Sequence, residues 1–548
     1  MNNRITKNKI VAAFVASLIL GAQFPLLAQT NRTNPSVNPE QSASQSEATR
    51  LSKQANQLSQ QGKFREAIPL LEQALKLQEA SLGKDHPEIG ILLNELALLY
   101  TNQGQYAKAA PLYQRSLQIH EAYFGSNHPK IVTVLNNFAM LYHYQGQYAA
   151  SEPLYLRALT IRETAFGKEH LSLATPLGNL AELYRVQGQY AKALPYYQRS
   201  LRIQETALGK NHLSLATVLN NLGVFSLQQG QYSQAESLFV RALNIQETNL
   251  RPDHPAIAQS LSNLATALLY QGRYAASEPL FIRALTIQET VLGKTHPDVA
   301  VALHNLAGMY QEQGKYAASE PLYLRALSIR EQALGQNHPD VAATLTALAV
   351  LYRNQKQPAK AESSYLRAIR INETIFGKDH PDVASSLQHL ATLYRDRKDY
   401  AASEPLYLRA LSIREARLGA THPDVGSTLN TLALLYQEQK LFSKAEPLLL
   451  RALSIYEARL GKEHSRIATV LHNLANLYAL QKQPDKAEPL FHRALKMSEA
   501  TLGETHPDTI TTMRTLAVFY GALGNSARAQ EFIDRAIRAE QRSQANVR

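Results

Sequence analysis

One period of the chain, residues 128–169, reads HPKIVTVLNNFAMLYHYQGQYAASEPLYLRALTIRETAFGKE. Apolar residues recur every three or four positions over 131–144 and again over 148–166, which is the spacing of one face of an α-helix. Gly146 separates the two segments, and glycine is the usual residue for the left-handed conformation that ends a helix. The period therefore predicts two helices, helix A and helix B, joined by a tight A–B turn.

This period of 42 residues runs through almost the whole chain. Its most regular mark is a histidine in the loop before helix A, found without slippage at His86, His128, His170, His212, His254, His296, His338, His380, His422, His464 and His506. Self-similarity at such a period is typical of helical solenoids, because one helix pair cannot bury its apolar face alone. We expect an all-α solenoid of about twelve helix-turn-helix pairs.

A glutamate and an arginine keep the same register in helix B. The columns run from Glu79 and Glu121 to Glu499, and from Arg115 and Arg157 to Arg535. Arg115 and Glu121 lie six positions apart, about 240° around a helix with 3.6 residues per turn, so they cannot pair within one helix. We expect them to bond neighbouring repeats.

The loop between repeats carries both a helix stop and a helix start. Gly125 ends one helix B, and Pro129 suits the first turn of the next helix A, where a missing amide proton costs little. Five loops place an aspartate at the helix N-terminus, which is favourable by about 0.3–1 kcal/mol each: Asp298, Asp340, Asp382, Asp424 and Asp508. The loop histidines recur once per repeat and do not converge on one ion, so we interpret them as capping and packing residues and expect no metal site.

The ends of the chain differ from the repeats. Residues 1–28 combine a basic start, an apolar run over 10–20 and a small residue at Ala28, a pattern typical of a cleaved signal peptide. Residues 29–45 are polar, and we expect a disordered linker there. The repeat array would cover 46–541, followed by a polar tail at 542–548. We expect export to the periplasm or out of the cell without stable membrane insertion, the alternative being a tether formed by an uncleaved N-terminal segment.

Composition narrows the chemistry. The absence of cysteine excludes disulfides, thiolate nucleophiles and cysteine-type zinc sites. A formal net charge of +12 is a mild bias over 548 residues and demands no nucleic-acid partner. No nucleophile with its base, convergent carboxylate pair, phosphate loop or metal cluster stands out from the repeat, so we expect neither an enzyme nor a cofactor. The oligomeric state is left open by the sequence.

The quoted period resembles the tetratricopeptide repeat (TPR). The residues that carry the resemblance are Phe138, Ala139, Tyr142, Gly146, Tyr148, Ser151, Tyr155 and Ala158. Phe138 departs from the leucine that the family favours but remains large and apolar. The 42-residue period, with LNNLG at 219–223 and LHNLA at 303–307, looks like the kinesin-light-chain subtype. The resemblance implies a right-handed superhelix whose A helices line a concave groove for peptides or partner domains; it implies no motor function, because fold alone does not define function.

The first candidate site is a column of asparagines in helix A. The resemblance places six of them where tetratricopeptide grooves hold a partner's backbone: Asn137, Asn179, Asn221, Asn263, Asn305 and Asn473. An amide side chain both donates and accepts hydrogen bonds, so it can bind a main chain of any sequence. The alternative is that the column was copied by repeat duplication, or that these amides bond the neighbouring helix. We expect a non-catalytic scaffold that binds partner proteins or peptides in this groove outside the cytoplasm.

The second candidate site lies where lysine replaces glycine at the A–B turn. Glycines up to Gly314 give way to Lys356, Lys398, Lys440 and Lys482 before Gly524 restores the pattern. Stacking would align these lysines into a basic ridge that, with Arg185, Arg353 and Arg395, would bind an anionic polymer or envelope surface. The alternative is a set of solvated lysines, each costing about 1 kcal/mol relative to glycine if the turn is left-handed.

Overall fold

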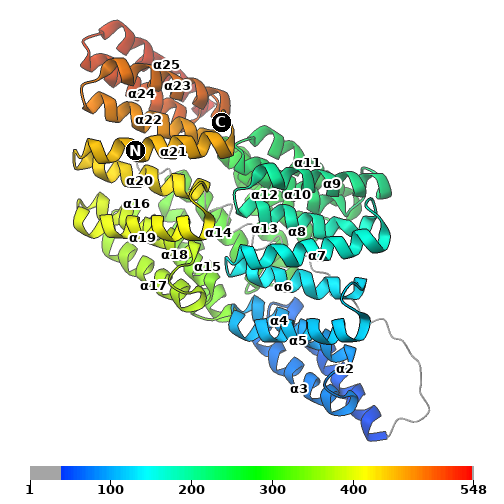
Figure 1. The fold of residues 1–548 in the computed structure, drawn as a ribbon. Helices are drawn as coiled ribbons and strands as arrows, with labels where there is room; N and C mark the ends of the chain where they lie inside the picture. The colour runs from blue at the N-terminus through cyan, green and yellow to red at the C-terminus, as the bar shows by residue number, and fades with distance from the viewer. Residues whose placement is uncertain (1–38, 546–548) are drawn as a thin grey trace.

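A computed structural model of the chain describes residues 39–545, and over that range all regular secondary structure is helical (Figure 1). The helices form twelve consecutive A–B pairs, which confirms the predicted all-α solenoid. The A helices are α2 (Pro39–Gln60), α4 (Pro87–Asn102), α6 (Val132–Tyr144), α8 (Ala174–Val186), α10 (Leu215–Gln228), α12 (Pro255–Tyr270), α14 (Pro297–Glu312), α16 (Pro339–Asn354), α18 (Pro381–Asp396), α20 (Pro423–Glu438), α22 (Ser465–Leu480) and α24 (Pro507–Ala522). The B helices are α3 (Phe64–Leu82), α5 (Tyr106–Phe124), α7 (Tyr148–Phe166), α9 (Tyr190–Leu208), α11 (Tyr232–Asn249), α13 (Tyr274–Leu292), α15 (Tyr316–Leu334), α17 (Pro358–Phe376), α19 (Tyr400–Leu418), α21 (Phe442–Leu460), α23 (Pro484–Leu502) and α25 (Ser526–Ala545). Short 3₁₀ turns, η1 (Pro129–Ile131) and η2 (Leu171–Leu173), precede α6 and α8.

The observed boundaries are close to the predicted ones except at the two ends. Helix α2 begins at Pro39, so residues 39–45 of the expected linker are helical, and α25 continues past 541 to Ala545. Once Ala48 and Leu51 are buried in the first pair, extending the helix by two turns costs only weak local propensity. The predicted signal peptide, residues 29–38 of the linker and residues 546–548 of the tail lie outside the described residues.

The turns and caps of the repeat have the conformations that the sequence predicts. Gly146 has a φ of 65° at the A–B turn, and Gly125 has a φ of 93° at the end of α5. In the loop that follows, His128 Nδ1 accepts a hydrogen bond from the Lys130 N–H at 3.2 Å. The other ten loop histidines make the same cap, with N···N distances from 3.0 to 3.3 Å. The histidine column therefore caps helix A.

The arginine and glutamate columns join neighbouring B helices. Arg115 contacts Glu79 and Arg157 contacts Glu121, each with an N···O distance of 2.6 Å, and the pattern continues to Arg535 with Glu499 at 2.5 Å. This confirms the expected bonds between repeats. Each pair is partly exposed, so a single pair contributes at most about 1 kcal/mol. Their recurrence makes a continuous ladder along the outer surface.

The A helices form the inner wall of the superhelix. Successive A helices such as α4 and α6, or α8 and α10, contact each other more than successive B helices do. A stack of wedge-shaped pairs curves toward the side on which its members are closest. The A helices therefore line the concave side, and the B helices face outward.

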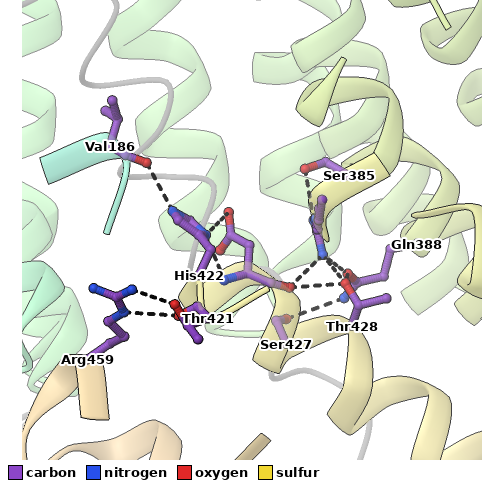
Figure 2. A network of polar contacts seen from close by, with 10 residues as sticks. Val186, Ser385, Gln388, Thr421, His422, Ser427, Thr428 and Arg459 are labelled. Carbon is purple, nitrogen blue, oxygen red and sulfur yellow. Dashed lines mark hydrogen bonds and ion pairs between the residues drawn. The ribbon is translucent and has the colours of Figure 1, made fainter. Parts of the chain in front are cut away.

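The superhelix is wound so tightly that one coil rests on the next. His338 Nε2 lies 3.1 Å from Asn102 O, and His422 Nε2 lies 3.0 Å from Val186 O, in both cases 236 residues earlier. Because Nδ1 already accepts the capping hydrogen bond, Nε2 carries the proton and donates it to that carbonyl. Figure 2 shows His422, at the start of α20, pointing to Val186 at the end of α8. One coil thus spans between five and six repeats.

We call this contact the inter-coil interface. It consists of the loops at His296, His338, His380, His422, His464 and His506 and the A–B turns at Gly62, Gly104, Gly146, Gly188, Gly230 and Gly272. A Cβ added to Gly62 would lie 2.5 Å from Pro297 Cδ, and one added to Gly188 would lie 2.7 Å from Pro423 Cδ. These glycines therefore provide space for the next coil as well as a positive φ.

Candidate functional site

The asparagine column lies on the inner wall, and part of it bonds the preceding repeat. In four repeats the side-chain Nδ2 donates to the Oδ1 of an asparagine 43 residues earlier, at distances from 2.9 to 3.3 Å: Asn137 to Asn94, Asn179 to Asn136, Asn263 to Asn220 and Asn473 to Asn430. The expected alternative, a bond to the neighbouring helix, therefore holds for these four residues. Each such bond occupies one N–H group and leaves the second N–H of that amide for other partners.

The six asparagines differ in accessibility. Asn263 and Asn305 are fully buried, and Asn137 and Asn473 are nearly so. Neither amide atom of Asn305 has a hydrogen-bond partner among the described residues. Asn179 and Asn221 are only half-buried. The accessible part of the column therefore lies on α8 and α10.

The column begins with a carboxylate. Glu95 of α4 stands one repeat before Asn137, is 6% exposed, and its Oε2 has no hydrogen-bond partner among the described residues. Burial without a cation raises the pKa of this carboxyl to about 7. Glu95 is therefore partly protonated near neutral pH.

A buried ion pair lies deeper in the wall. Arg185 Nε is 2.7 Å from Glu182 Oε2, and Tyr197 Oη donates to the same oxygen at 2.9 Å. The ion pair with Arg185 holds the pKa of Glu182 below its usual value despite the desolvation that opposes it. Burial lowers the pKa of the neighbouring His143 to about 4. A glutamate and an arginine three positions apart on helix A were the sequence signal for this cluster.

The structure overturns one part of the expected basic ridge. Arg185, Arg353 and Arg395 are 2%, 8% and 3% exposed, so they cannot meet an anionic polymer. Arg353 Nε lies 3.7 Å from Asp396 Oδ2, and Arg395 Nε lies 3.5 Å from Glu438 Oε1. Carboxylates on the same wall hold these arginines inward, because a buried cation must be paired.

The four lysines lie on exposed A–B turns. Their φ values are 59° to 63°, so each occupies the left-handed conformation. Asp399 follows Lys398 in the chain, and Glu438 is close enough to Lys398 to feel its charge. Acidic side chains therefore interrupt the row of lysines.

Residues 39–545 contain no cluster of three or more His, Asp or Glu side chains suited to a metal ion. None of their helices is both long enough and apolar enough to cross a bilayer.

Comparison with known proteins identifies the family of the repeat. The family model described as tetratricopeptide repeat matches residues 46–113, 88–164, 172–248, 214–290, 256–332, 298–374, 340–416, 382–458 and 466–541. No curated protein matches the chain.

Three solved structures match parts of this chain. BtubC (BKLC) from P. vanneervenii is 24% identical, with 42% of this chain and 92% of that one covered and a TM-score of 0.35. A putative kinesin light chain from Podosopora anserina is 25% identical, with 37% and 97% covered and a TM-score of 0.32. A monomeric mutant of IFIT1 with Gppp-AAAA is 17% identical, with 74% and 90% covered and a TM-score of 0.42. These TM-scores are low, so the assignment rests on the repeats themselves: the chain belongs to the tetratricopeptide repeat family.

Proposed function

We propose that this chain is a scaffold that holds an extended segment of a partner protein along the inner wall of its first coil, outside the cytoplasm. Tetratricopeptide repeat proteins generally act as protein-interaction scaffolds, and the fold is typically non-catalytic. The location on the inner wall and the export are our inferences.

The observation that carries the proposal is the unused hydrogen-bonding capacity on α4, α6, α8 and α10. Asn94, Asn136, Asn179 and Asn221 are half-buried, so water or a ligand reaches them. The Nδ2 groups of Asn94 and Asn136 donate to no described residue, because each of these amides acts only as an acceptor for the next repeat. A peptide main chain offers the complementary carbonyl and N–H groups at regular spacing.

The test uses peptides selected from a random library on the purified chain, with affinities measured by fluorescence anisotropy. The double variant Asn179→Ala, Asn221→Ala should bind them at least about tenfold more weakly, the effect of losing hydrogen bonds of about 1 kcal/mol each. The matched control is Asn473→Ala, which removes an amide of the same column in the second coil and should leave the affinity within about twofold. Selection of no peptide, or equal binding by both variants, would contradict the inner-wall site.

Export has its own test. Intact-mass measurement on the protein recovered from its native envelope or medium should give a chain that begins at Gln29, because Ala28 provides the small residue needed before the cleavage point. Recovery of the full-length chain in a membrane fraction would favour the tether, and recovery in the cytoplasm would contradict export.

A further inference from the structure

The A–B turns fall into two groups that differ in what lies above them. The six turns from Gly62 to Gly272 are covered by loops of the second coil. Among residues 39–545 no further coil lies above the later turns, and a Cβ added to Gly314 or Gly524 would meet nothing within 4 Å. All four lysines fall within this uncovered group. The uncovered turns form what we call the free edge.

The lysines occupy a conformation that glycine adopts at no cost. A non-glycine residue in the left-handed region costs about 1 kcal/mol. In the covered turns at Gly62 and Gly188 a side chain is excluded, because a Cβ would lie 2.5 Å and 2.7 Å from a proline ring of the next coil. On the free edge the side chain is sterically allowed, yet the conformational cost remains. Backbone strain that recurs at four equivalent positions indicates a functional role for these lysines.

The register of the superhelix shows what would meet the lysines. If a second copy continued the superhelix, its α2–α3 pair would follow α25. The spacing of 236 residues would then place the loops of that copy at His86, His128, His170 and His212 over Lys356, Lys398, Lys440 and Lys482. These loops have the same histidine cap as the loops of the inter-coil interface, and in this chain they are half-buried or exposed.

We propose that Lys356, Lys398, Lys440 and Lys482 are stops that keep further copies of this chain from stacking on its free edge. A lysine Cβ at such a turn would press on the histidine ring of the incoming loop, as a Cβ added to Gly146 would press on His380. At Lys482 the ammonium group would also lose water without gaining a partner, because the incoming loop, residues 209–214, has no carboxylate. Lys130, in the loop at His128, would in addition lie near Lys398 and repel it, because both side chains are positively charged.

The last described helix, α25, offers an apolar surface to a further copy. Ile533 and Ile537 of α25 are 41% and 44% exposed, whereas Tyr113 and Tyr197, which hold the place of Ile533 in earlier repeats, are fully buried. The array thus ends on uncovered apolar side chains that a further helix pair would bury. The matching surface of α2 is polar, because Arg50 and Gln54 stand where α4 has Leu92 and Leu96. The end-on contact between two copies is therefore weak, and the contact along the free edge determines whether they stack.

The experiment is sedimentation velocity of the whole chain over a concentration series. The variant Lys356→Gly, Lys398→Gly, Lys440→Gly, Lys482→Gly should self-associate at least tenfold more tightly than the parent, into species that grow with concentration. Adding His86→Ala, His128→Ala, His170→Ala and His212→Ala should restore the monomer, because these side chains make the contact. The fold of each variant is checked by circular dichroism.

The matched control removes four lysines elsewhere. Lys108, Lys360, Lys444 and Lys486 lie on B helices over tyrosine rings, and their change to Ala lowers the net charge equally while leaving the turns intact. This control should remain monomeric. The proposal is overturned if the glycine variant stays monomeric, if the parent already stacks, if the control associates equally, or if the alanine changes at the histidines make no difference.

Discussion

The loops at His212 and His422 have the same histidine in the same register but different surroundings. His212 is exposed and only caps its own helix, whereas His422 is 7% exposed and also donates to Val186 O across the inter-coil interface. Local sequence is responsible for the cap in both cases. Burial follows from position in the superhelix, since only the second coil has another coil beneath its loops. The same side chain is therefore a local cap in one coil and an inter-coil contact in the other.

The largest effect should come from placing a free-edge residue into the interface. Gly188→Lys brings a Cβ to 2.7 Å from Pro423 Cδ, and overpacking of this kind costs about 1–3 kcal/mol beyond the left-handed penalty. We expect the coils to separate locally, with a larger radius of gyration in small-angle X-ray scattering. Gly314→Lys is the control, because it has a similar φ but nothing within 4 Å. Equal scattering curves for the two variants would show that the coils do not touch in solution.

The next largest difference should appear when the histidine of each loop is removed. His422→Ala deletes the cap and leaves the buried Val186 carbonyl without its donor, at a cost of about 1–3 kcal/mol. His212→Ala deletes a cap alone, which costs about 0.5–2 kcal/mol. Urea unfolding midpoints give the comparison, and hydrogen exchange at Gly188 should rise only for His422→Ala. Exchange that rises equally in both would contradict the contact.

Acid should loosen the interface. Burial lowers the pKa of His338 and His422, and it lowers that of His464 to about 3, although Asp340 and Asp424 oppose the shift for the first two. A histidine with a lowered pKa in the folded state stabilises the fold above its unfolded value of about 6.5 and loses that contribution as the pH falls below it. Each such histidine contributes up to about 1.4 kcal/mol per pH unit in that window. Scattering at pH 7.5 and pH 5 should show the coils opening, and unchanged curves would contradict the prediction.

The smallest effect concerns a single lysine of the free edge. Lys398→Gly relieves a φ of 63° and should stabilise its repeat by about 1 kcal/mol, seen as a small rise in the thermal midpoint. Lys360→Gly, within helix α17, should instead lower it by about 1 kcal/mol. A drop in both would mean that the turn lysine makes a stabilising contact.

Most of the fold could be predicted from single repeats. The period, the helix limits over 148–166, the histidine caps and the arginine–glutamate ladder all arise within one repeat or between neighbours, where sequence spacing is a guide to distance. The candidate site could be predicted only in part. The column of asparagines was visible, but its division into buried and half-buried members depends on how closely the A helices approach. The burial of Arg353 and Arg395 could not be predicted, because their carboxylate partners lie on the next helix A.

By itself the sequence determined the solenoid, because identical local signals recur every 42 residues and each helix pair must be covered by its neighbours. Only the tertiary structure decided that coils touch after 236 residues, that the turns at Gly62 and Gly188 need glycine for space, and that four lysines lie on an uncovered edge. The physical reason is that the rise and rotation of each repeat are small and add up along the chain. Added along the chain, they bring into contact residues that no local sequence pattern relates to each other.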